Sequence, residues 1–423
     1  MQTFLRKIKI AFSDKSLRKR ILFVLFAFVL FRIFAAIPIP GVNDLKLNEF
    51  LSDNQFFGIL NIFSGGGLSN LSIVMLGVGP YITASIIMQL MTIMIPKLKA
   101  LYHEEGEAGR KKFIQYSRML TIPLAAIQGF SLIVLLQRQG IIEQLGAFNM
   151  LTNLAVVVGG AVLIMWIGEL ISEFGVGNGV SLIIFAGIVS GMPSQIQQLI
   201  YTFDISQLPI YAGALFIALL IIVGVVIVNE GERPIPVTYA RRVRGMKMYG
   251  GVSTYLPLRI NQAGVMPIIF ALSIMLFPQM IATFLSGMNS AILQKIGSVL
   301  ETLSQTTWLY AIFYFILVFL FTYFYTAVTF DPKSLATNLQ KGGAFIPGIR
   351  PGPSTISYID KILSRITLMG ALFLGLIAIL PLIMQTITGI TALAIGGTAL
   401  LIVVSVVLDL IKKIDAQVLM REY

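Results

Sequence analysis

Long uncharged apolar segments alternate with shorter polar segments along the whole chain. Ten of the apolar segments are about 20 residues long, the length that a helix needs to cross the hydrocarbon core of a bilayer. Their bounds are 21–37, 72–95, 119–136, 151–171, 180–200, 210–228, 263–285, 307–330, 366–385 and 391–411. Because lipid cannot satisfy backbone hydrogen bonds, such segments span a membrane as helices. The pattern predicts an all-α membrane protein with ten transmembrane helices.

The ten spans divide into five in residues 1–200 and five in residues 201–423. Because five is an odd number, the second half enters the membrane in the opposite sense to the first. Counting alone therefore predicts two inverted halves, and by analogy with inverted-repeat transporters a pathway between them. The basic stretch before the first apolar segment resembles the start of a signal peptide, but Pro38 and Pro40 follow where a cleavage site is expected. We expect an uncleaved first span.

Composition supports a membrane protein and limits the possible chemistry. Of the 423 residues, 57% are hydrophobic and 12% are charged, about half the charged fraction of a soluble globular protein. The chain has no cysteine, which excludes disulfides and thiolate metal sites. Its single histidine, His103, cannot form a metal cluster alone.

The basic residues are confined almost entirely to alternate loops. Of the 31 Lys and Arg residues, 27 lie in five segments: 1–20, 96–118, 230–262, 331–365 and 412–423. The other four are Arg32, Lys46, Arg138 and Lys295. The positive-inside rule therefore predicts that both termini and the large loops are cytoplasmic. This topology signal explains most of the net charge of +12 without a nucleic-acid partner.

The spans contain almost no charged residues. Ion-coupled transporters carry titratable groups near the bilayer centre. Here Glu169 and Asp409 lie toward the cytoplasmic ends of their spans, and Arg32 can extend outward to the interface. The sequence argues against an ion-driven pump.

The segment 56–94 is unusual because it is rich in glycine. Gly65, Gly66 and Gly67 follow an apolar stretch, and Gly77, Gly79 and Pro80 lie further on. Irregular backbone at membrane depth must be buried in protein or line a cavity. Two structures fit this pattern equally: a half-helix, a break and a full span, or an outer loop followed by a kinked helix.

The basic loops also contain Pro, Gly, Tyr and Ile among their charges, notably in 229–245 and 338–365. Contact with anionic lipid requires only charge. The mixed composition indicates shaped loops that dock on a protein or ribosomal partner, with lipid contact as the alternative.

Eight extended motifs, in order, resemble the SecY/Sec61-alpha family of protein-translocation channel subunits. They are NIFSGGGLSNLSI, GPYITASIIMQLM, GEAGRKKFIQYSR, GNGVSLIIFAGIVSG, VNEGERPIPVTYARR, AGVMPIIFA, FIPGIRPG and GGTALLIVVSVVLD. The resemblance extends along almost the whole chain. It implies two inverted five-helix halves around a central hourglass pore, which is closed outside by a plug half-helix and narrowed midway by aliphatic side chains.

The resemblance also assigns the residues of the pore. The plug corresponds to residues 57–68, with Phe63, Gly65, Gly66 and Gly67 at its turn. The pore ring corresponds to Val78, Ile82, Ile184, Ile188, Ile269 and Ile402. Val78 stands where the family commonly has isoleucine. A ring of branched aliphatic side chains can dewet and resist ion leakage, yet it offers no hydrogen bonds that would hold a passing polypeptide. Without the motifs, each of these residues would be interpreted as core or lipid-facing.

The resemblance further implies a lateral gate and a docking face. The gate lies between two pairs of spans, the second and third on one side and the seventh and eighth on the other. Signal sequences bind there and hydrophobic segments leave for lipid, and Thr83, Gln89 and Phe277 correspond to its residues. Arg350 corresponds to a loop arginine needed for the SecA motor. The neighbouring loop, which also serves ribosome docking, carries Arg241, Arg242 and Arg244.

The expected function is a passive channel for unfolded secretory polypeptides in the bacterial inner membrane. The expected partners are the membrane subunits SecE and SecG, the SecA motor ATPase, the ribosome, nascent polypeptides and the lipid bilayer. Energy would come from SecA or the translating ribosome, with no cofactor and no enzymatic activity in the chain. A small-molecule or lipid transporter is the alternative that hydropathy permits. A membrane enzyme would need an intramembrane nucleophile or metal cluster, and neither is apparent.

Overall fold

The structure is a computed structural model of residues 1–423. It describes residues 14–40, 61, 64–143, 146–201, 208–239, 242–244, 247–249, 253–286, 291–388 and 391–422. Each of the ten predicted spans corresponds to one helix in these ranges. The helices are α2 (Lys15–Ala35), α5 (Gly79–Met94), α7 (Gly106–Arg138), α8 (Ala147–Phe174), α9 (Gly179–Tyr201), α10 (Leu208–Glu230), α11 (Met266–Ser286), α13 (Thr307–Thr329), α15 (Pro353–Thr388) and α16 (Thr391–Glu422).

Within the described ranges, five helices are individually long and apolar enough to cross a membrane: Gly106–Arg138, Ala147–Phe174, Tyr211–Glu230, Thr307–Lys341 and Pro353–Met384. The pair α5 and α6 (Pro96–His103) meets the same standard together but is bent by 115°. Pro96 explains the bend, because the residue before a proline avoids helical dihedrals, and Ile95 is extended with φ −114° and ψ 107°. The chain is a multi-pass helical membrane protein.

Several helix boundaries differ from the predicted spans. α5 begins at Gly79 rather than at residue 72, because residues 73–78 form turns. α7 and α15 begin earlier than predicted, at Gly106 and Pro353, so each carries part of a basic segment as helix. A helix that extends beyond the bilayer can expose polar side chains to water, and hydropathy therefore locates only its membrane portion.

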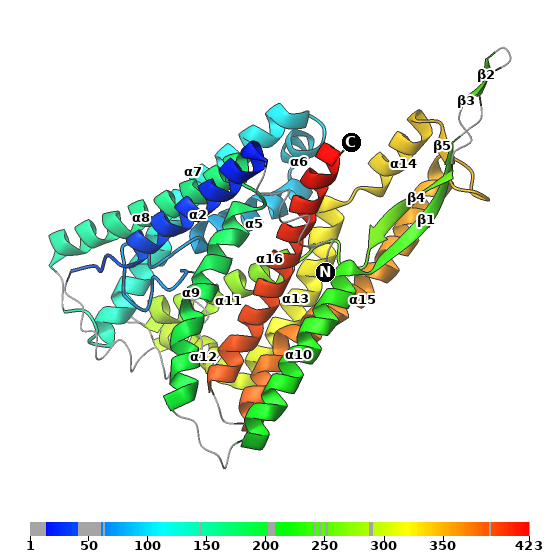
Figure 1. The fold of residues 1–423 in the computed structure, drawn as a ribbon. Helices are drawn as coiled ribbons and strands as arrows, with labels where there is room; N and C mark the ends of the chain where they lie inside the picture. The colour runs from blue at the N-terminus through cyan, green and yellow to red at the C-terminus, as the bar shows by residue number, and fades with distance from the viewer. Residues whose placement is uncertain are drawn as a thin grey trace.

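Figure 1 shows α2, α7 and α8 on one side of the molecule and α10, α15 and α16 on the other. Two helices between these groups join them. α11, from the second half of the chain, contacts α5 and α7 of the first half, and α9, from the first half, contacts α16. The largest buried cluster contains residues from all of these helices except α7, and joins α2 and α9 to α11, α13 and α16. The core therefore lies between the two halves of the chain.

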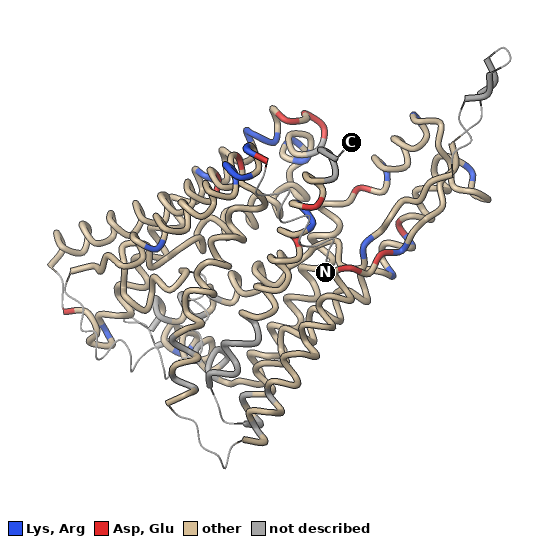
Figure 2. Tube along the Cα trace, in the orientation of Figure 1, with Lys and Arg blue, Asp and Glu red and all other residues tan. Residues whose placement is uncertain are grey.

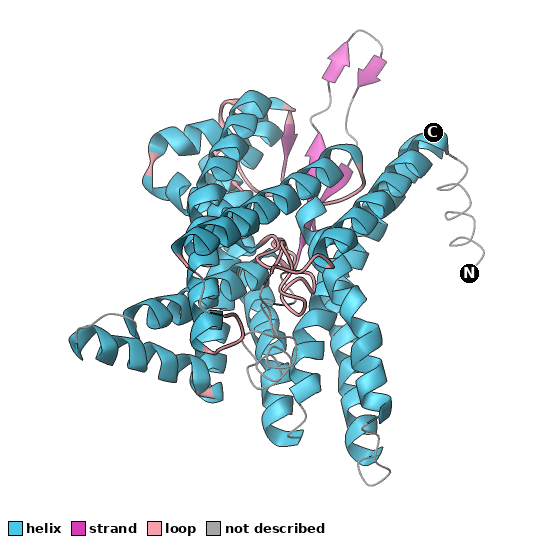
Figure 3. Ribbon diagram, turned by 90° about the vertical axis from the view of Figure 1, so that its left-hand side faces the viewer, coloured by secondary structure: helices cyan, strands magenta, loops and turns pink. Residues whose placement is uncertain are grey.

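A small sheet projects from one end of the helices (Figures 1 and 3). β1 (Glu232–Tyr239) pairs antiparallel with β4 (Ser253–Arg259) from Glu232↔Arg259 to Thr238↔Ser253. β5 (Ala344–Phe345) pairs with the other edge of β1, and β2 (Arg242–Arg244) pairs with β3 (Lys247–Tyr249) near the hairpin tip. The two large basic loops are thus joined in one sheet. Figure 2 shows Lys and Arg gathered toward this end of the molecule.

Two shorter helices complete the description: α12 (Ala291–Gln305) and α14 (Pro332–Lys341). α14 begins where Asp331 accepts a hydrogen bond from the Lys333 backbone N–H at 3.0 Å. A separate small core joins the sheet to the helices. In it, Ile235, Val237 and Leu258 of the sheet are buried against Ile346, which follows β5, and Ile359, which lies on α15.

Candidate pore, gate and docking surface

The six predicted ring residues converge in one buried cluster from four different helices. Val78 caps the start of α5, and Ile82 lies one turn further along. α9 contributes Ile184 and Ile188, α11 contributes Ile269, and α16 contributes Ile402. All six have an exposed fraction of 5% or less and belong to the same cluster. Their helices come from both halves of the chain.

A cavity of about 860 Å³ reaches this cluster, because Ile82 and Ile269 are among its lining residues. Its walls come from α5, α7, α8, α9, α11 and α13, and they include Lys111, Arg118 and Glu169. The Arg118 Nε donates to Glu169 Oε1 at 2.7 Å, which connects α7 to α8 beside the cavity. The cavity therefore has both polar and apolar walls and lies beside the buried aliphatic cluster.

The predicted plug lies only partly within the described residues. Phe63 and residues 57–60 lie outside them. We call residues 64–78 the glycine turn, since they form turns with an isolated bridge between Pro38 and Ser72. The turn is deeply buried, with Leu68, Leu71 and Met75 at 0% exposure. This burial agrees with the expectation that irregular backbone at membrane depth is buried in protein or lines a cavity.

The glycine turn is packed closely against α2 and α9. Gly65 has φ +67°, and a Cβ there would overlap the ring of Phe31 on α2. A Cβ on Gly187 of α9 would in turn overlap the backbone of Gly65. Beside this contact, Arg32 Nη1 donates to Ser190 Oγ at 3.1 Å, so Arg32 connects α2 to α9 near the turn. Glycine at positions 65 and 187 therefore allows the turn, α2 and α9 to lie this close together.

Polar atoms are buried on α5 and α7, two of the helices of the predicted lateral gate. Thr83 is 2% exposed, and Phe277 on α11 is half-buried. Among the described residues, Thr83 Oγ1, Gln89 Oε1 and Gln128 Nε2 are buried without a hydrogen-bond partner. α11 contacts both α5 and α7, so this side of the bundle is closed. Gln128 was not predicted from the sequence, although an amide inside the apolar run of α7 is a visible signal.

Of the predicted docking arginines, Arg242, Arg244 and Arg350 lie within the described residues, at the end of the molecule that carries the sheet. Arg350 is exposed in the turn between β5 and α15, where Gly348 and Gly352 have φ +81° and +106°. The carbonyl oxygen of Arg350 accepts from Thr355 Oγ1 at 2.9 Å, which holds the turn on the first turn of α15. Arg242 and Arg244 lie on β2, and Arg241 lies outside the described residues.

These features define a class of protein: a multi-pass helical membrane protein whose two halves meet at a buried aliphatic cluster. A family model named SecY matches residues 72–411. The protein translocase subunit SecY of Mycobacterium tuberculosis (strain ATCC 25618 / H37Rv) is 43% identical over 429 residues, covering 96% of each chain. That of Thermus thermophilus is 43% identical over 423 residues, covering 98% of this chain and 95% of the relative. The chain belongs to the SecY family.

Solved structures show the same fold at lower identity. A protein-conducting channel matches with a TM-score of 0.66 and 18% identity, covering 96% of this chain and 93% of the other. Sec61 in a canine ribosome–channel complex from the endoplasmic reticulum matches with a TM-score of 0.61 and 17% identity over the same shares. The ten-helix channel fold expected from the motifs is therefore confirmed.

Proposed function

We propose that the chain forms the pore through which a bacterial translocase moves unfolded secretory polypeptides across the inner membrane. The observation that carries this proposal is that six aliphatic side chains from four helices lie in one buried cluster that a large cavity reaches. Val78, Ile82, Ile184, Ile188, Ile269 and Ile402 form the pore ring. An aliphatic ring excludes water when empty and makes no directional bond to a passing chain.

Residues 57–68, whose last five residues begin the glycine turn, act as the plug. Its support is the close packing of Gly65 between Phe31 on α2 and Gly187 on α9. The turn bonds to the segment after α2, where Ile39 N–H donates to the Leu71 carbonyl at 2.9 Å, but its contact with α9 is close packing of small residues. That contact can be lost and restored without breaking an ion pair. The seal is therefore strong in the resting state and reversible.

The lateral gate lies between two pairs of helices, α5 with α7 on one side and α11 with α13 on the other. Signal sequences bind there, and hydrophobic segments leave through it into lipid. The buried, unpaired atoms of Thr83 and Gln89 on α5 support this assignment. Burying a polar atom without a partner costs about 1–3 kcal/mol, which makes the closed interface less stable than an apolar one. Phe277 lies on the facing helix and contributes apolar contact.

The basic sheet and the Arg350 turn form the docking face for the SecA motor and the ribosome, on the cytoplasmic side with both chain termini. Arg350 is exposed on a turn that Thr355 holds in place, and the β2–β3 hairpin carries Arg242 and Arg244 beyond the helix ends. Arg241 belongs to the same hairpin sequence. Two similar solved channels, canine Sec61 and yeast Ssh1, are ribosome complexes, which supports the ribosome as a partner. SecE and SecG are the expected membrane subunits.

Reconstitution with purified partners tests the proposal. Liposomes containing the chain with SecE and SecG should take up an unfolded precursor only when SecA and ATP are present. All ATP hydrolysis should require SecA, because the chain acts as a passive pore. ATP hydrolysis by the chain without SecA, or uptake that does not depend on SecA or a ribosome, would contradict this function.

A further inference from the structure

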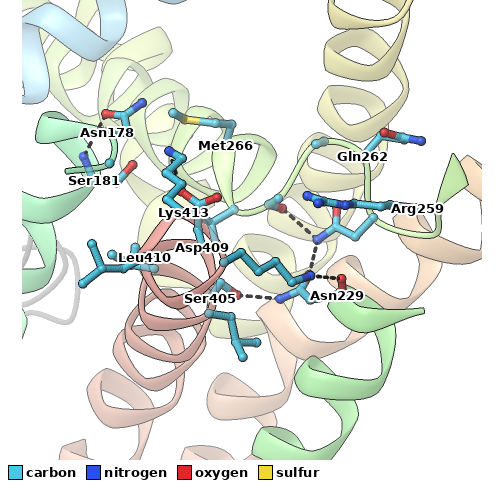
Figure 4. A pocket seen from close by; sticks show the side chains of 18 of the residues that line it. Asn178, Ser181, Asn229, Arg259, Gln262, Met266, Ser405, Asp409, Leu410 and Lys413 are labelled. Atoms are coloured by element: carbon cyan, nitrogen blue, oxygen red, sulfur yellow. Dashed lines mark hydrogen bonds and ion pairs between the residues drawn. The ribbon is translucent and has the colours of Figure 1, made fainter. Parts of the chain in front are cut away.

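Four polar residues form a junction at the base of the projecting sheet (Figure 4). Asn229 is its centre and contacts the other three. The Asn229 Oδ1 accepts from Asn261 Nδ2 at 2.8 Å, and its Nδ2 donates to Ser405 Oγ at 3.1 Å. Its carbonyl oxygen accepts from Lys412 Nζ at 3.0 Å. We call Asn229, Asn261, Ser405 and Lys412 the hairpin junction.

The junction holds both ends of the β1–β4 hairpin. Asn229 lies at the end of α10, three residues before β1, and Asn261 lies two residues after β4. The backbone N–H of Ile260 donates to the Gly231 carbonyl at 2.8 Å, which closes the hairpin between them. Any tilt of the hairpin therefore moves Asn229 and Asn261 together.

The other end of the junction leads to the pore ring. Ser405 lies on α16 one helical turn after Ile402 and is 8% exposed. Asn261 Nδ2 also donates to the Gly264 carbonyl at 3.1 Å, in the turn just before α11 begins. Ile269 lies in the first turn of that helix. Two of the six ring residues are thus within about one turn of a junction contact.

The junction is adjacent to open space rather than packed core. It borders a cavity of about 260 Å³ that is lined by α9, α11 and α16. Asn261 is 7% exposed, and its Oδ1 is buried without a partner among the described residues. Hydrogen bonds beside such a cavity can change partners without displacing packed side chains. The junction is therefore both the connection between sheet and spans and a place where they can shift.

Two adjacent lysines on α16 differ in what they connect. Lys412 also pairs with Glu230 Oε1 at 2.9 Å and so holds the last residues of α10 against α16. Lys413 pairs with Asp409 at 2.8 Å, within its own helix. Only the Lys412–Glu230 pair joins two elements. A substitution of Lys413 is therefore a matched control for the same substitution of Lys412.

We propose that the hairpin junction is a positioning device: it transmits displacement of the docking sheet to α16 and α11, and so to Ile402 and Ile269. The proposal rests on the proposed function, because it takes those residues as the ring and the sheet as the docking face. A partner that docks on the sheet opens the ring through Asn229, Asn261, Ser405 and Lys412. A purely structural junction would instead affect stability or docking, but not the link between docking and opening.

The experiment compares Lys412→Met, Ser405→Ala and Asn261→Leu with the control Lys413→Met. The full chain is reconstituted with its membrane subunits in planar bilayers. Ribosome affinity, resting ion conductance and conductance with a ribosome docked are measured for each variant. We expect unchanged affinity and resting conductance for the three junction variants. Their conductance increase on docking should fall at least about fivefold, the lower end of ordinary coupling between sites. Lys413→Met and the conservative Lys412→Arg should behave as the wild type.

Two outcomes would overturn the inference. A normal conductance increase on docking in all three junction variants would show that the junction transmits nothing. Lost ribosome affinity with normal opening at saturating ribosome would show that it only supports the sheet. The proposed function fails separately, if the wild type shows no response to docking or if Ile402→Gly leaves the resting conductance unchanged.

Discussion

Replacing Gly187 by alanine should separate the glycine turn from α9 and raise the resting leak of the channel. The added methyl group would lie 3.0 Å from the carbonyl carbon and 3.2 Å from the nitrogen of Gly65, and closer still to its Cα. Non-bonded carbon atoms are most favourable at about 3.5–4.0 Å, so the turn must retreat by more than about 1 Å. Both contacting groups are backbone, and no flexible side chain can absorb the change.

The free-energy cost can be estimated from overpacking in other protein interiors, about 1–3 kcal/mol. The cost applies to the closed state, because the contact is lost once the turn leaves α9. The ratio of closed to displaced turn should therefore fall about 5- to 150-fold. Resting conductance should rise in the same proportion until the aliphatic ring alone limits the current.

Planar-bilayer recordings of the reconstituted complex without precursor or docking partner provide the assay. Gly191→Ala is the matched control, because it lies one turn further on α9 and a Cβ there has no atom within 4 Å. Thermal unfolding of both variants in detergent shows that each is folded. Equal resting conductance in Gly187→Ala and Gly191→Ala would refute the role of the glycine turn in the seal.

Three further predictions follow from the pore and docking assignments. Arg350→Glu should abolish SecA-driven precursor uptake into vesicles, and Lys361→Glu on the exposed face of α15 should not; normal uptake by the first variant would contradict the docking role. Deleting residues 57–68 should raise resting ion conductance, because the plug is lost, and an unchanged leak would exclude the plug assignment. Ile184→Asn should hydrate the ring and raise resting conductance, whereas Val223→Asn on the exposed side of α10 should not. Similar currents in these last two variants would show that the ring does not seal the pore.

The spans were predictable because lipid imposes a simple requirement on sequence. Backbone groups in hydrocarbon must bond within their own segment, and side chains there must be apolar, so length and hydropathy located all ten helices. The start of α5 was misplaced because residues 72–78 are as apolar as a lipid-facing helix, although they are buried as turns. Hydropathy cannot distinguish burial in protein from burial in lipid. Gly77 and Gly79 were the available signal.

The three-stranded sheet was not predicted, because its third strand is held by a partner distant in the sequence. β5 pairs with β1 across more than a hundred residues, and its two residues carry no strand pattern of their own. The pore-ring residues could not be identified from spacing alone, because isoleucine at helical spacing is common in any membrane protein. Only the sequence motifs singled them out. Asn229 and Asn261 escaped notice because an asparagine beside a loop is ordinary until the fold brings the two together.

The most direct measurement of the central claim is where a polypeptide in transit lies. The chain has no cysteine, so single cysteines can be placed at Ile82 and Ile269 of the ring and at Val223, which is 53% exposed on α10. A precursor with one cysteine and a folded C-terminal block is stalled in the reconstituted translocase under oxidising conditions. The account predicts disulfides from the precursor to both ring positions and none to the α10 position. Cross-linking at position 223 as strong as at the ring, or no cross-linking at the ring, would contradict a pore through the centre of this chain.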